Sequence, residues 1–303
     1  MIRQAEPAQG LPTLIGKYRV LGRLGEGATS EVFLARDDFH GRDVAIKCLL
    51  PAASVAHQPF HARFFDAEAA LVGRLSHPNV VQIHDAVADA RQPYLVMEYV
   101  AGDTLKRFCQ PDALLPLEQV VEIGFKCAMA LGYVARQGLI HRDVKPANLL
   151  AVMSGAEVID VKVSDFGSAL RLDADSTQVH LVGSLAYMAP EQLDGAAALD
   201  ARADMYSLAA VLYHLIAGRP PFDALQQQAI MHQIYHGTAP PLSSLREGVP
   251  PGLQSLIERS LAKERELREK LGRVAGELGT MINFDFDRYD LKPEARQTLT
   301  RKA

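Results

Sequence analysis

The sequence predicts an α+β protein, with a small β-rich lobe followed by a larger α-helical lobe. From Tyr18 to Ile46, apolar residues alternate with polar ones, which is the period of a half-buried strand. Beyond Leu117, apolar residues recur every three or four positions, which is the period of a helix. Because strands come first and helices second, the order favours a segregated α+β arrangement, and 303 residues are enough for two modest cores.

The composition is that of a globular protein, with 48% hydrophobic and 22% charged residues. A net charge of −4 and the lack of a basic block argue against nucleic acid as the main partner. Cys48, Cys109 and Cys127 show no CxxC spacing, which indicates reduced thiols. The first residues lack the apolar core of a signal peptide, and no apolar run approaches the roughly 18 residues of a membrane span. We therefore expect a cytoplasmic protein without a membrane span.

The β-rich part is expected to begin after residues 1–16, which are polar, contain several prolines and glycines, and are predicted to form a flexible leader. The stretch GEGATSEV then interrupts the strand alternation. A G-x-G-x-x-G loop predicts a dinucleotide-binding fold only where a helix follows, and here the alternating EVFLARD follows. We therefore predict a hairpin whose backbone N–H groups could cover phosphates. Ser30 occupies the third glycine position, so a plain hairpin turn is the alternative interpretation of this motif alone.

Two further segments complete the predicted β-rich lobe. Lys47 ends the apolar strand Val44–Ile46 beside the glycine hairpin, where an ammonium group is suited to pair with phosphates. Helical spacing over Phe60–Leu75 predicts a helix that carries Glu68. Tyr94–Val100 is predicted to be an apolar strand that leads into a charged, turn-rich segment.

The second part of the chain is predicted to be helical. Leu117–Gln137 has one apolar face, whereas Asp204–Ala217 is apolar almost all round and is therefore expected to be buried inside its lobe. His232 and His236 are four residues apart on a further expected helix and could in principle bind zinc. No glutamate lies between them and no third ligand is evident, so surface or packing histidines are the favoured interpretation.

The residues that carry chemistry gather in the stretch 141–167. Asp143 and Asn148 lie five residues apart on a polar loop with Lys145 between them, and Asp165 follows an apolar strand. In phosphoryl transfer, one carboxylate can accept a proton from the attacking hydroxyl, while an amide and a second carboxylate hold Mg²⁺. A lysine can neutralise the moving negative charge. This set of residues therefore indicates chemistry on a metal-bound phosphate.

In this order, the segments GEGATSEV, VAIK, HRDVKPANLL, DFG and MAPE resemble the motifs of the protein kinases, over roughly residues 18–268. The lysine two residues beyond Asp143 is similar to that of serine/threonine kinases, and the sequence as a whole resembles the eukaryotic-type kinases of bacteria. The resemblance implies a two-lobed protein kinase fold over 17–279, with an N-lobe at 17–97 and a C-lobe at 101–279. It also implies transfer of the γ-phosphoryl group of ATP, with Mg²⁺ (Mn²⁺ possible), to Ser or Thr hydroxyls of protein substrates.

The resemblance assigns roles residue by residue. Asp143 would be the catalytic base, Lys145 would stabilise the γ-phosphate, and Lys47 would hold the other phosphates with help from Glu68. The expected metal ligands are Asn148 and Asp165. The expected nucleotide contacts are Leu24, Gly25, Gly27, Val32, Ala45, Lys47, Met97 as gatekeeper, the backbone of Glu98 and Val100, and Leu150.

Regulation is implied by the position of Arg142, directly before the expected base. Such an arginine is suited to bind a phosphate added to the polar loop that carries Ser176 and Thr177. The resemblance also implies two structural pairs, Asp204 with the backbone beside Arg142, and Arg268 with Glu191.

Two other functions are kept as alternatives. A pseudokinase scaffold would bind ATP without chemistry, and a small-molecule phosphotransferase would use the same fold on a different acceptor. The tail 280–303 is an incomplete segment of uncertain structure, and from residue 281 it resembles the start of an outer-membrane-protein-A-like, peptidoglycan-binding domain. Only about 20 residues match, too few to bury a core, so peptidoglycan is not an expected partner.

Overall fold

The computed structural model describes residues 11–27, 30–49, 71, 73–88, 93–155, 157–166, 185–193 and 199–262. The chain divides into two compact units. The first unit comprises residues 1–104 and 149–171, and the second comprises residues 105–148 and 172–303. The strands gather in the first unit and the helices in the second, which confirms the predicted α+β class. Residues 149–171, expected within the C-lobe, belong to the β-rich first unit because they form strands that pair with Gly102–Thr104.

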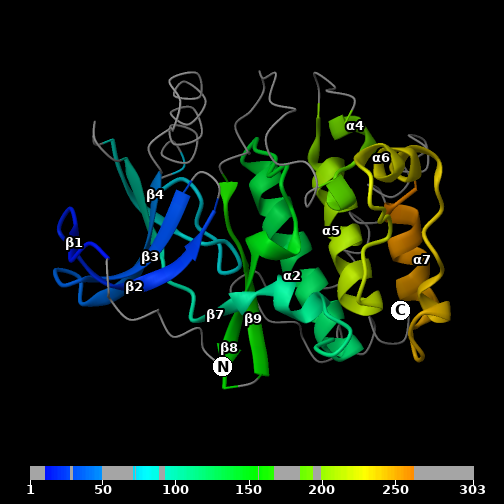
Figure 1. Cartoon of the computed structure of the whole chain (residues 1–303), viewed down its shortest axis with the longest axis horizontal. Coiled ribbons are helices and arrows are strands. Elements are labelled where there is room, and N and C mark those ends of the chain that lie inside the picture. Colours follow the sequence, from blue (N-terminus) through cyan, green and yellow to red (C-terminus); the bar gives the residue numbers. More distant parts are fainter. Residues whose placement is uncertain are drawn as a thin grey trace. The chain divides into compact units, whose positions relative to one another are not determined.

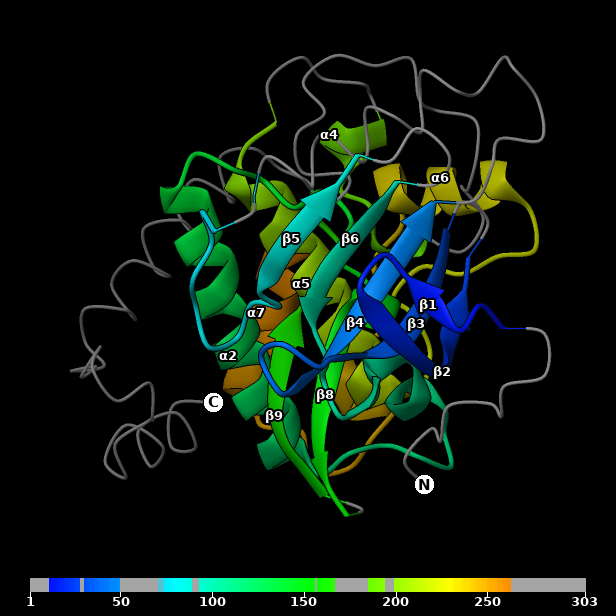
Figure 2. The same ribbon diagram turned by 90° about the vertical axis from the view of Figure 1, so that its left-hand side faces the viewer.

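The first unit contains a six-stranded sheet in which every neighbouring pair is antiparallel (Figure 2). The strand order is β1-β2-β3-β4-β6-β5. The alternation that predicted strands from Tyr18 onward is therefore confirmed. The strands are β1 (Leu14–Ile15), β2 (Tyr18–Glu26), β3 (Ser30–Asp37), β4 (Arg42–Leu49), β5 (Ile83–Val87) and β6 (Tyr94–Glu98).

One face of this sheet carries the core of the first unit. Successive side chains of a strand point to opposite faces, so alternate residues of β3, β4 and β6 share this core. Its buried members are Ile15, Tyr18, Phe33, Ala35, Val44, Ile46, Cys48, Tyr94 and Val96.

The expectation of a flexible leader over 1–16 is wrong for the end of that segment. Leu14 and Ile15 pair with Arg19 and Tyr18 across a tight turn, and the side chain of Ile15 is buried in the core. A two-residue strand is too short to show periodicity, which is why the sequence pattern did not reveal it. Residues 1–10 lie outside the described part of the chain.

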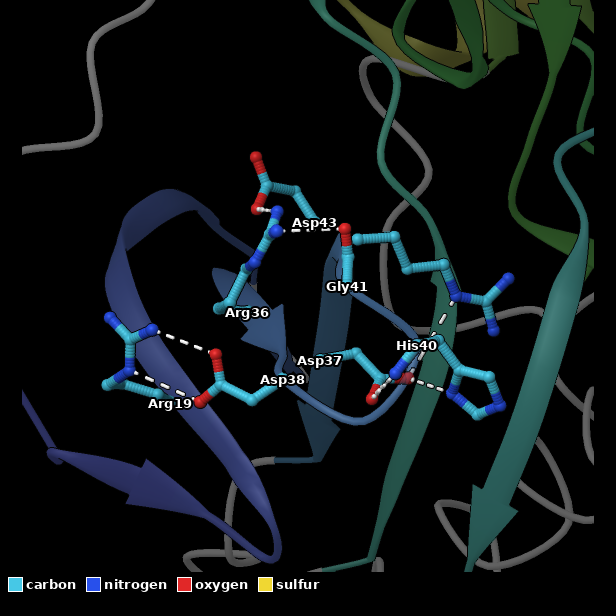
Figure 3. A network of polar contacts seen from close by, with 8 residues as sticks. Arg19, Arg36, Asp37, Asp38, His40, Gly41 and Asp43 are labelled. Carbon is cyan, nitrogen blue, oxygen red and sulfur yellow. Dashed lines mark hydrogen bonds and ion pairs between the residues drawn. The ribbon is translucent and has the colours of Figure 1, made fainter.

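Polar contacts hold the turn between β3 and β4 (Figure 3). The carboxylate of Asp37, whose side chain is only 3% exposed, accepts the backbone N–H of His40, and its Oδ2 lies 2.7 Å from His40 Nδ1. Arg36 donates to Asp43 and to the carbonyl of Gly41, both at 2.8 Å. Because these contacts close the turn, the register of β3 and β4 is fixed at the end of the hairpin away from Lys47.

A second, three-stranded sheet also lies in the first unit and leads to Asp165. Its last strand is hydrogen-bonded to the turn before β5: Asn79 Nδ2 donates to Asp160 Oδ1 and to the carbonyl of Val161, both at 2.8 Å. These bonds fix the backbone shortly before Asp165. The strands are β7 (Gly102–Thr104), β8 (Leu149–Ser154) and β9 (Glu157–Val163), in that order.

The second unit is built around the helix α5 (Ala201–Ala217), which packs against α2, α7, η2 and η5 of the same unit (Figure 1). Most of its side chains are buried, as its all-round apolar sequence predicted. It starts three residues before the predicted start, because Asp200 caps it by accepting the N–H of Arg202. Gly218 ends it with a φ of 70°, a conformation that favours glycine.

The other helices of this unit are shorter or lie closer to its surface. Leu117–Gln137 was the predicted extent of α2, and the observed helix ends one residue earlier. Of the helices in the described ranges, none has the length and apolar character needed to cross a membrane. The α-helices are α2 (Leu117–Arg136), α4 (Pro190–Leu193), α6 (Gln227–His236) and α7 (Pro251–Ser260), and the 3₁₀ helices are η2 (Leu105–Cys109), η3 (Pro146–Asn148), η5 (Leu185–Tyr187) and η6 (Leu242–Ser244).

Candidate active site

Four of the expected nucleotide contacts in the first unit, Val32, Ala45, Lys47 and Met97, share one face of the six-stranded sheet. Val32 lies opposite Lys47 in the β3–β4 register, and Ala45 lies opposite Met97 in the β4–β6 register. These four positions alternate with the buried core positions, so they belong to the face opposite the core. Gly25 pairs with Val32 and therefore lies beside the same face.

The glycine stretch forms a hairpin, as predicted, and not the strand-to-helix turn of a dinucleotide fold. Strands β2 and β3 remain paired up to Glu26 and Glu31, and the N–H of Gly27 donates to the carbonyl of Ser30 at 2.8 Å. Ser30, the departure from the third glycine, is buried and begins β3. The hairpin thus places its turn at the end of the strands that carry Val32 and Lys47.

The ammonium group of Lys47 and the carboxylate of Asp165 form an ion pair, with Nζ 2.8 Å from Oδ1. The lysine side chain is 16% exposed and that of the aspartate 43%. Asp165 has a φ of 65°, a left-handed conformation that is uncommon for a residue other than glycine. Phe166, which follows, is buried and anchors this strained backbone. The structure therefore brings together two predicted site residues that are 118 positions apart.

In the segment expected to bind the adenine base, some of the polar groups already form hydrogen bonds or ion pairs within the protein. The N–H of Glu98 donates to the carbonyl of Gln82 at 2.8 Å, so a contact from the Glu98 backbone to a base would have to come from its carbonyl. The carboxylate of Glu98 forms an ion pair with Lys162 at 3.0 Å. Leu150 lies in β8, opposite Lys162 of β9. Val100 follows β6 in the same unit.

In the second unit, Asp204 holds the backbone that leads to Asp143. Its two carboxylate oxygens accept the N–H groups of His141 and Arg142, both at 2.8 Å. The N–H of Asp143 in turn donates to His141 Nδ1 at 3.3 Å. Burial raises the pKa of Asp204, while the two N–H donors oppose that shift. The predicted contact between Asp204 and this backbone is confirmed.

The carboxylate of Asp143 is bound by two side chains. Lys145 Nζ lies 2.7 Å from its Oδ2, and Asn148 Nδ2 donates to the same oxygen at 2.9 Å. The same amide also donates to the Asp143 carbonyl at 2.9 Å, and Asn148 is buried. Three of the predicted site residues are thus brought into one hydrogen-bonded group. The carboxylate is held in a single orientation and carries a neutralising ammonium beside it.

The backbone of Arg142 is hydrogen-bonded, while its guanidinium has a hydrogen-bond donor that is not satisfied by the described residues. Its φ is 66°, and its carbonyl accepts Gln192 Nε2 at 2.8 Å. The Nε atom is buried and has no hydrogen-bond partner among the described residues. Burial lowers the pKa of this guanidinium, with Asp204 acting in the opposite sense. A buried donor of this kind favours an anionic partner.

The donor atoms suit a hard divalent cation. Asp165 offers a carboxylate, and Asn148 directs its Nδ2 toward Asp143, so the atom of the Asn148 amide with the chemistry of a metal ligand is its carbonyl oxygen. Oxygen ligands of these types are the ones that Mg²⁺ prefers. His232 and His236 have ring centroids 5.0 Å apart on α6, but within the described ranges no group of three or more His, Cys, Asp or Glu residues is arranged to hold a metal ion. Both His232 and His236 are exposed on α6, in agreement with the interpretation as surface or packing histidines.

Several predicted residues cannot be placed, because they lie outside the described residues. The expected partner of Lys47 on the helix Phe60–Leu75 is among them, as are the expected phosphorylation sites. The residues and segments concerned are Glu68, Gly167, Ser176, Thr177, Arg268 and the tail 280–303.

Other supporting residues were missed by the sequence analysis. Asn79 and Lys162 fix β9 before Asp165, since Lys162 Nζ also donates to the carbonyl of Pro78 at 2.6 Å. Gln192 connects the segment after η5 to Arg142. These contacts join residues 50 or more positions apart, and single polar residues in a strand or short helix give no sequence signal for such pairing.

Comparison with known proteins agrees with this arrangement. Residues 18–274 match the family model described as the protein kinase domain. The chain is 38% identical over 265 residues to the serine/threonine-protein kinase PknB of Mycobacterium leprae, covering 85% of this chain and 41% of that protein. It is 36% identical over 273 residues to a probable serine/threonine-protein kinase PknB of Bifidobacterium longum, covering 85% and 39%. The chain thus spans about two fifths of these relatives' length.

Solved structures give the same result. The crystal structure of a mutant PknI kinase domain from Mycobacterium tuberculosis superposes with a TM-score of 0.63 at 31% sequence identity. The superposition covers 88% of this chain and all of that domain. Together with the paired Lys47 and Asp165 and the group around Asp143, this likeness identifies the chain as a member of the protein kinase domain family.

Proposed function

We propose that this chain is a serine/threonine protein kinase that transfers the γ-phosphoryl group of ATP to Ser or Thr hydroxyls of protein substrates. The observation that carries the proposal is the group around Asp143, in which one carboxylate is oriented by Asn148 and neutralised by Lys145. Relatives named as serine/threonine-protein kinases support the choice of acceptor.

Asp143 is assigned the acceptor side of the reaction. Its carboxylate would orient the substrate hydroxyl and accept its proton as the bond to phosphorus forms. Asn148 keeps that carboxylate from rotating, and Lys145 would offset the negative charge that develops on the transferred group. Because all three contacts exist before a substrate arrives, little reorganisation is needed during the reaction.

Lys47 and Asp165 are assigned the nucleotide side. Bound ATP with Mg²⁺ would supply the phosphoryl group and shield its charge. Lys47 would exchange its ion pair with Asp165 for the α- and β-phosphates, and Asp165 would ligate the metal together with the Asn148 carbonyl. Gly25, Val32, Ala45 and Met97 on one sheet face, with Leu24, Gly27, Glu98, Val100 and Leu150, would contact the nucleotide. Mn²⁺ is of similar chemistry and would substitute.

Regulation is assigned to Arg142. A phosphate on Ser176 or Thr177 would supply the anionic partner that its buried Nε lacks among the described residues. The segment would then be held to the backbone next to Asp143, and activity would rise. Glu68 is kept as the proposed helix partner of Lys47 in the active state.

Two alternatives are less well supported. A pseudokinase scaffold loses the phosphate lysine, a metal ligand or the base, and here Lys47, Asp165 and Asp143 are all present and in contact with partners. A small-molecule phosphotransferase has little use for the segment Leu185–Leu193, which Gln192 ties to Arg142 beside the expected base. Such a segment suits a peptide acceptor better.

The three cysteines are buried thiols that form no disulfide, which supports work in a reducing compartment such as the cytoplasm. Peptidoglycan and nucleic acid are not proposed as partners.

The test is incubation of the chain with labelled ATP and Mg²⁺ in the presence of generic protein substrates, aminoglycosides and choline in separate reactions. Label on Ser and Thr of protein is the expected result, with no label on the small molecules. ATP binding without transfer to any acceptor would favour the pseudokinase, and label on a small molecule alone would favour the phosphotransferase.

A further inference from the structure

Tyr187 in η5 and His214 in the last turn of α5 form a contact that the proposed roles do not use. The hydroxyl of Tyr187 lies 2.8 Å from His214 Nδ1, and the two rings stack with centroids 6.1 Å apart and an interplanar angle of 15°. The backbone of Cys109 in η2, a segment that packs against α5, lies near the same ring. The imidazole therefore lies between two segments that are separate in sequence.

These contacts specify the protonation state of the histidine. Burial raises the pKa of Tyr187, so its hydroxyl keeps its proton and is able to donate to Nδ1. When the hydroxyl donates, Nδ1 is the bare nitrogen, and the proton of the neutral ring lies on Nε2. Burial also lowers the pKa of His214, which favours the neutral ring. Geometry and burial thus agree on a neutral Nε2–H tautomer.

The segment that Tyr187 belongs to reaches the expected catalytic loop. Gln192 accepts the N–H of Ala189 at 3.0 Å and donates to the carbonyl of Arg142 at 2.8 Å. Residues 185–193 are therefore fastened at two points, Gln192 at one end and Tyr187 near the other. Helix α5 contacts both the loop before Asp143 and the segment 185–193. Asp204 in its first turn binds the loop, and His214 in its last turn binds Tyr187.

We propose that His214 is a positioning residue, which in its neutral Nε2–H tautomer holds Tyr187 and thereby fixes residues 185–193 beside Asp143 for binding of the protein substrate. The inference rests on the proposed kinase activity for its substrate, but the contact itself does not. His214 touches neither nucleotide nor acceptor and acts through Tyr187.

A pH dependence follows from the surroundings of the ring. In the described part of the chain, the titratable groups near His214 are Tyr187 in η5, Cys109 in η2 and Asp223 after α5. Tyr187 and Cys109 are neutral below pH 7, because burial raises both pKa values. Among the groups that the structure describes here, Asp223 alone would offset an imidazolium, so protonation favours a segment that opens and lets water reach the ring. Substrate binding should weaken as pH falls below the ordinary histidine value of 6.5.

The test compares hydroxyl deletions on neighbouring elements. Tyr187→Phe removes the donor, and we expect the KM for a peptide or protein substrate to rise about fivefold, as for one lost hydrogen bond. The KM for ATP should stay within about twofold. Tyr213→Phe is the matched control, because Tyr213 lies next to His214 but donates to the Pro240 carbonyl at 2.9 Å. An unchanged peptide KM in Tyr187→Phe, or an equal rise in Tyr213→Phe, would overturn the proposal.

The role of the ring is tested by His214→Asn. The Asn Oδ1 can replace Nδ1 as acceptor but cannot titrate between pH 5 and 8. We expect its peptide KM at pH 7.5 to lie within about twofold of wild type. Between pH 5.5 and 7.5, this KM should change less with pH than that of wild type. An acid limb identical to that of wild type would contradict the titration of His214.

A readout without substrate separates this inference from the proposed function. Proton–nitrogen NMR of histidine-labelled protein, assigned by comparison with His214→Asn, should show a proton on Nε2 and a bare Nδ1 at pH 7. A proton on Nδ1 would refute the positioning contact whatever the activity. If the wild type phosphorylates no protein, the proposed function fails, while the expected tautomer would still support the contact.

Discussion

The Lys47–Asp165 pair sets the first prediction at the scale of single residues. Lys47→Met and Asp165→Asn should each lower phosphoryl transfer by about 10²–10³, because each removes one preorganised charge contact. The fold should survive, since neither side chain belongs to the sheet core. Steady-state assays with far-UV circular dichroism check both points. Lys126→Met, which removes a lysine that pairs with Glu122 on α2, is the control and should keep its activity.

Arg142 gives a second prediction at this scale. In wild type, treatment with a phosphatase should lower activity, because the phosphate on Ser176 or Thr177 no longer binds the guanidinium. In Arg142→Ala, the ratio between phosphorylated and treated enzyme should approach one. Arg202→Ala, which removes an exposed arginine paired with Asp200, should keep the wild-type ratio. Full activity of a wild-type sample in which mass spectrometry finds both hydroxyls unmodified would contradict this regulation.

The short-range contacts among these residues could be predicted from sequence, and the long-range ones could not. Asp143, Lys145 and Asn148 lie within six residues, so one loop brings them together whatever the rest of the chain does. Lys47 and Asp165 were predicted to act on the same ligand, but their direct pairing depends on how β4 and the end of β9 fold in one unit. The pairing of Tyr187 with His214 could not be predicted, because a single histidine within an apolar helix is common and does not indicate its partner.

At the scale of elements, α5 carries the third prediction. Asp204→Ala leaves two N–H groups, those of His141 and Arg142, without their acceptor. Each unsatisfied group costs about 1–3 kcal/mol, so the free energy of unfolding should fall by roughly 2–6 kcal/mol and transfer should be lost with the loop geometry. Asp200→Ala at the start of the same helix removes its exposed cap together with the ion pair to Arg202, and should cost about 1 kcal/mol without loss of activity. Denaturant unfolding and assays distinguish the two; equal effects would contradict the role of Asp204.

Strong periodicity decided which elements could be predicted. The alternation in β2, β3 and β4 and the all-round apolar α5 extend over eight or more residues and were predicted correctly. The strands β1 and β7 have two and three residues, so they give no pattern and were interpreted as leader and turn. Their pairing comes from tertiary contacts, with Ile15 buried in the core and Gly102 opposite Val152 in β8.

At the scale of the whole molecule, the order of strands and helices was enough to predict the α+β class. The division into units was not, because residues 149–171 follow helical sequence yet belong to the β-rich unit. Lys47 and Asp165 belong to the first unit, and Asp143, Lys145 and Asn148 belong to the second. Under the proposed function, ATP and Mg²⁺ bind only the folded chain, so these ligands are expected to stabilise it.

Thermal unfolding with Mg²⁺ and a non-hydrolysable ATP analogue tests this expectation. A ligand that binds only the folded chain at about 100 times its Kd stabilises it by about 2.7 kcal/mol, which corresponds to several degrees in Tm. Part of that shift should require Mg²⁺. This part should fall in Asp165→Asn, which replaces a proposed carboxylate ligand with a neutral amide, and in Asn148→Ala, which removes a proposed amide ligand. Asp200→Asn on the surface of α5 is the control and should keep the full shift. If Asn148→Ala keeps the Mg²⁺-dependent part, Asn148 serves only to orient Asp143, and its assignment as a metal ligand is wrong.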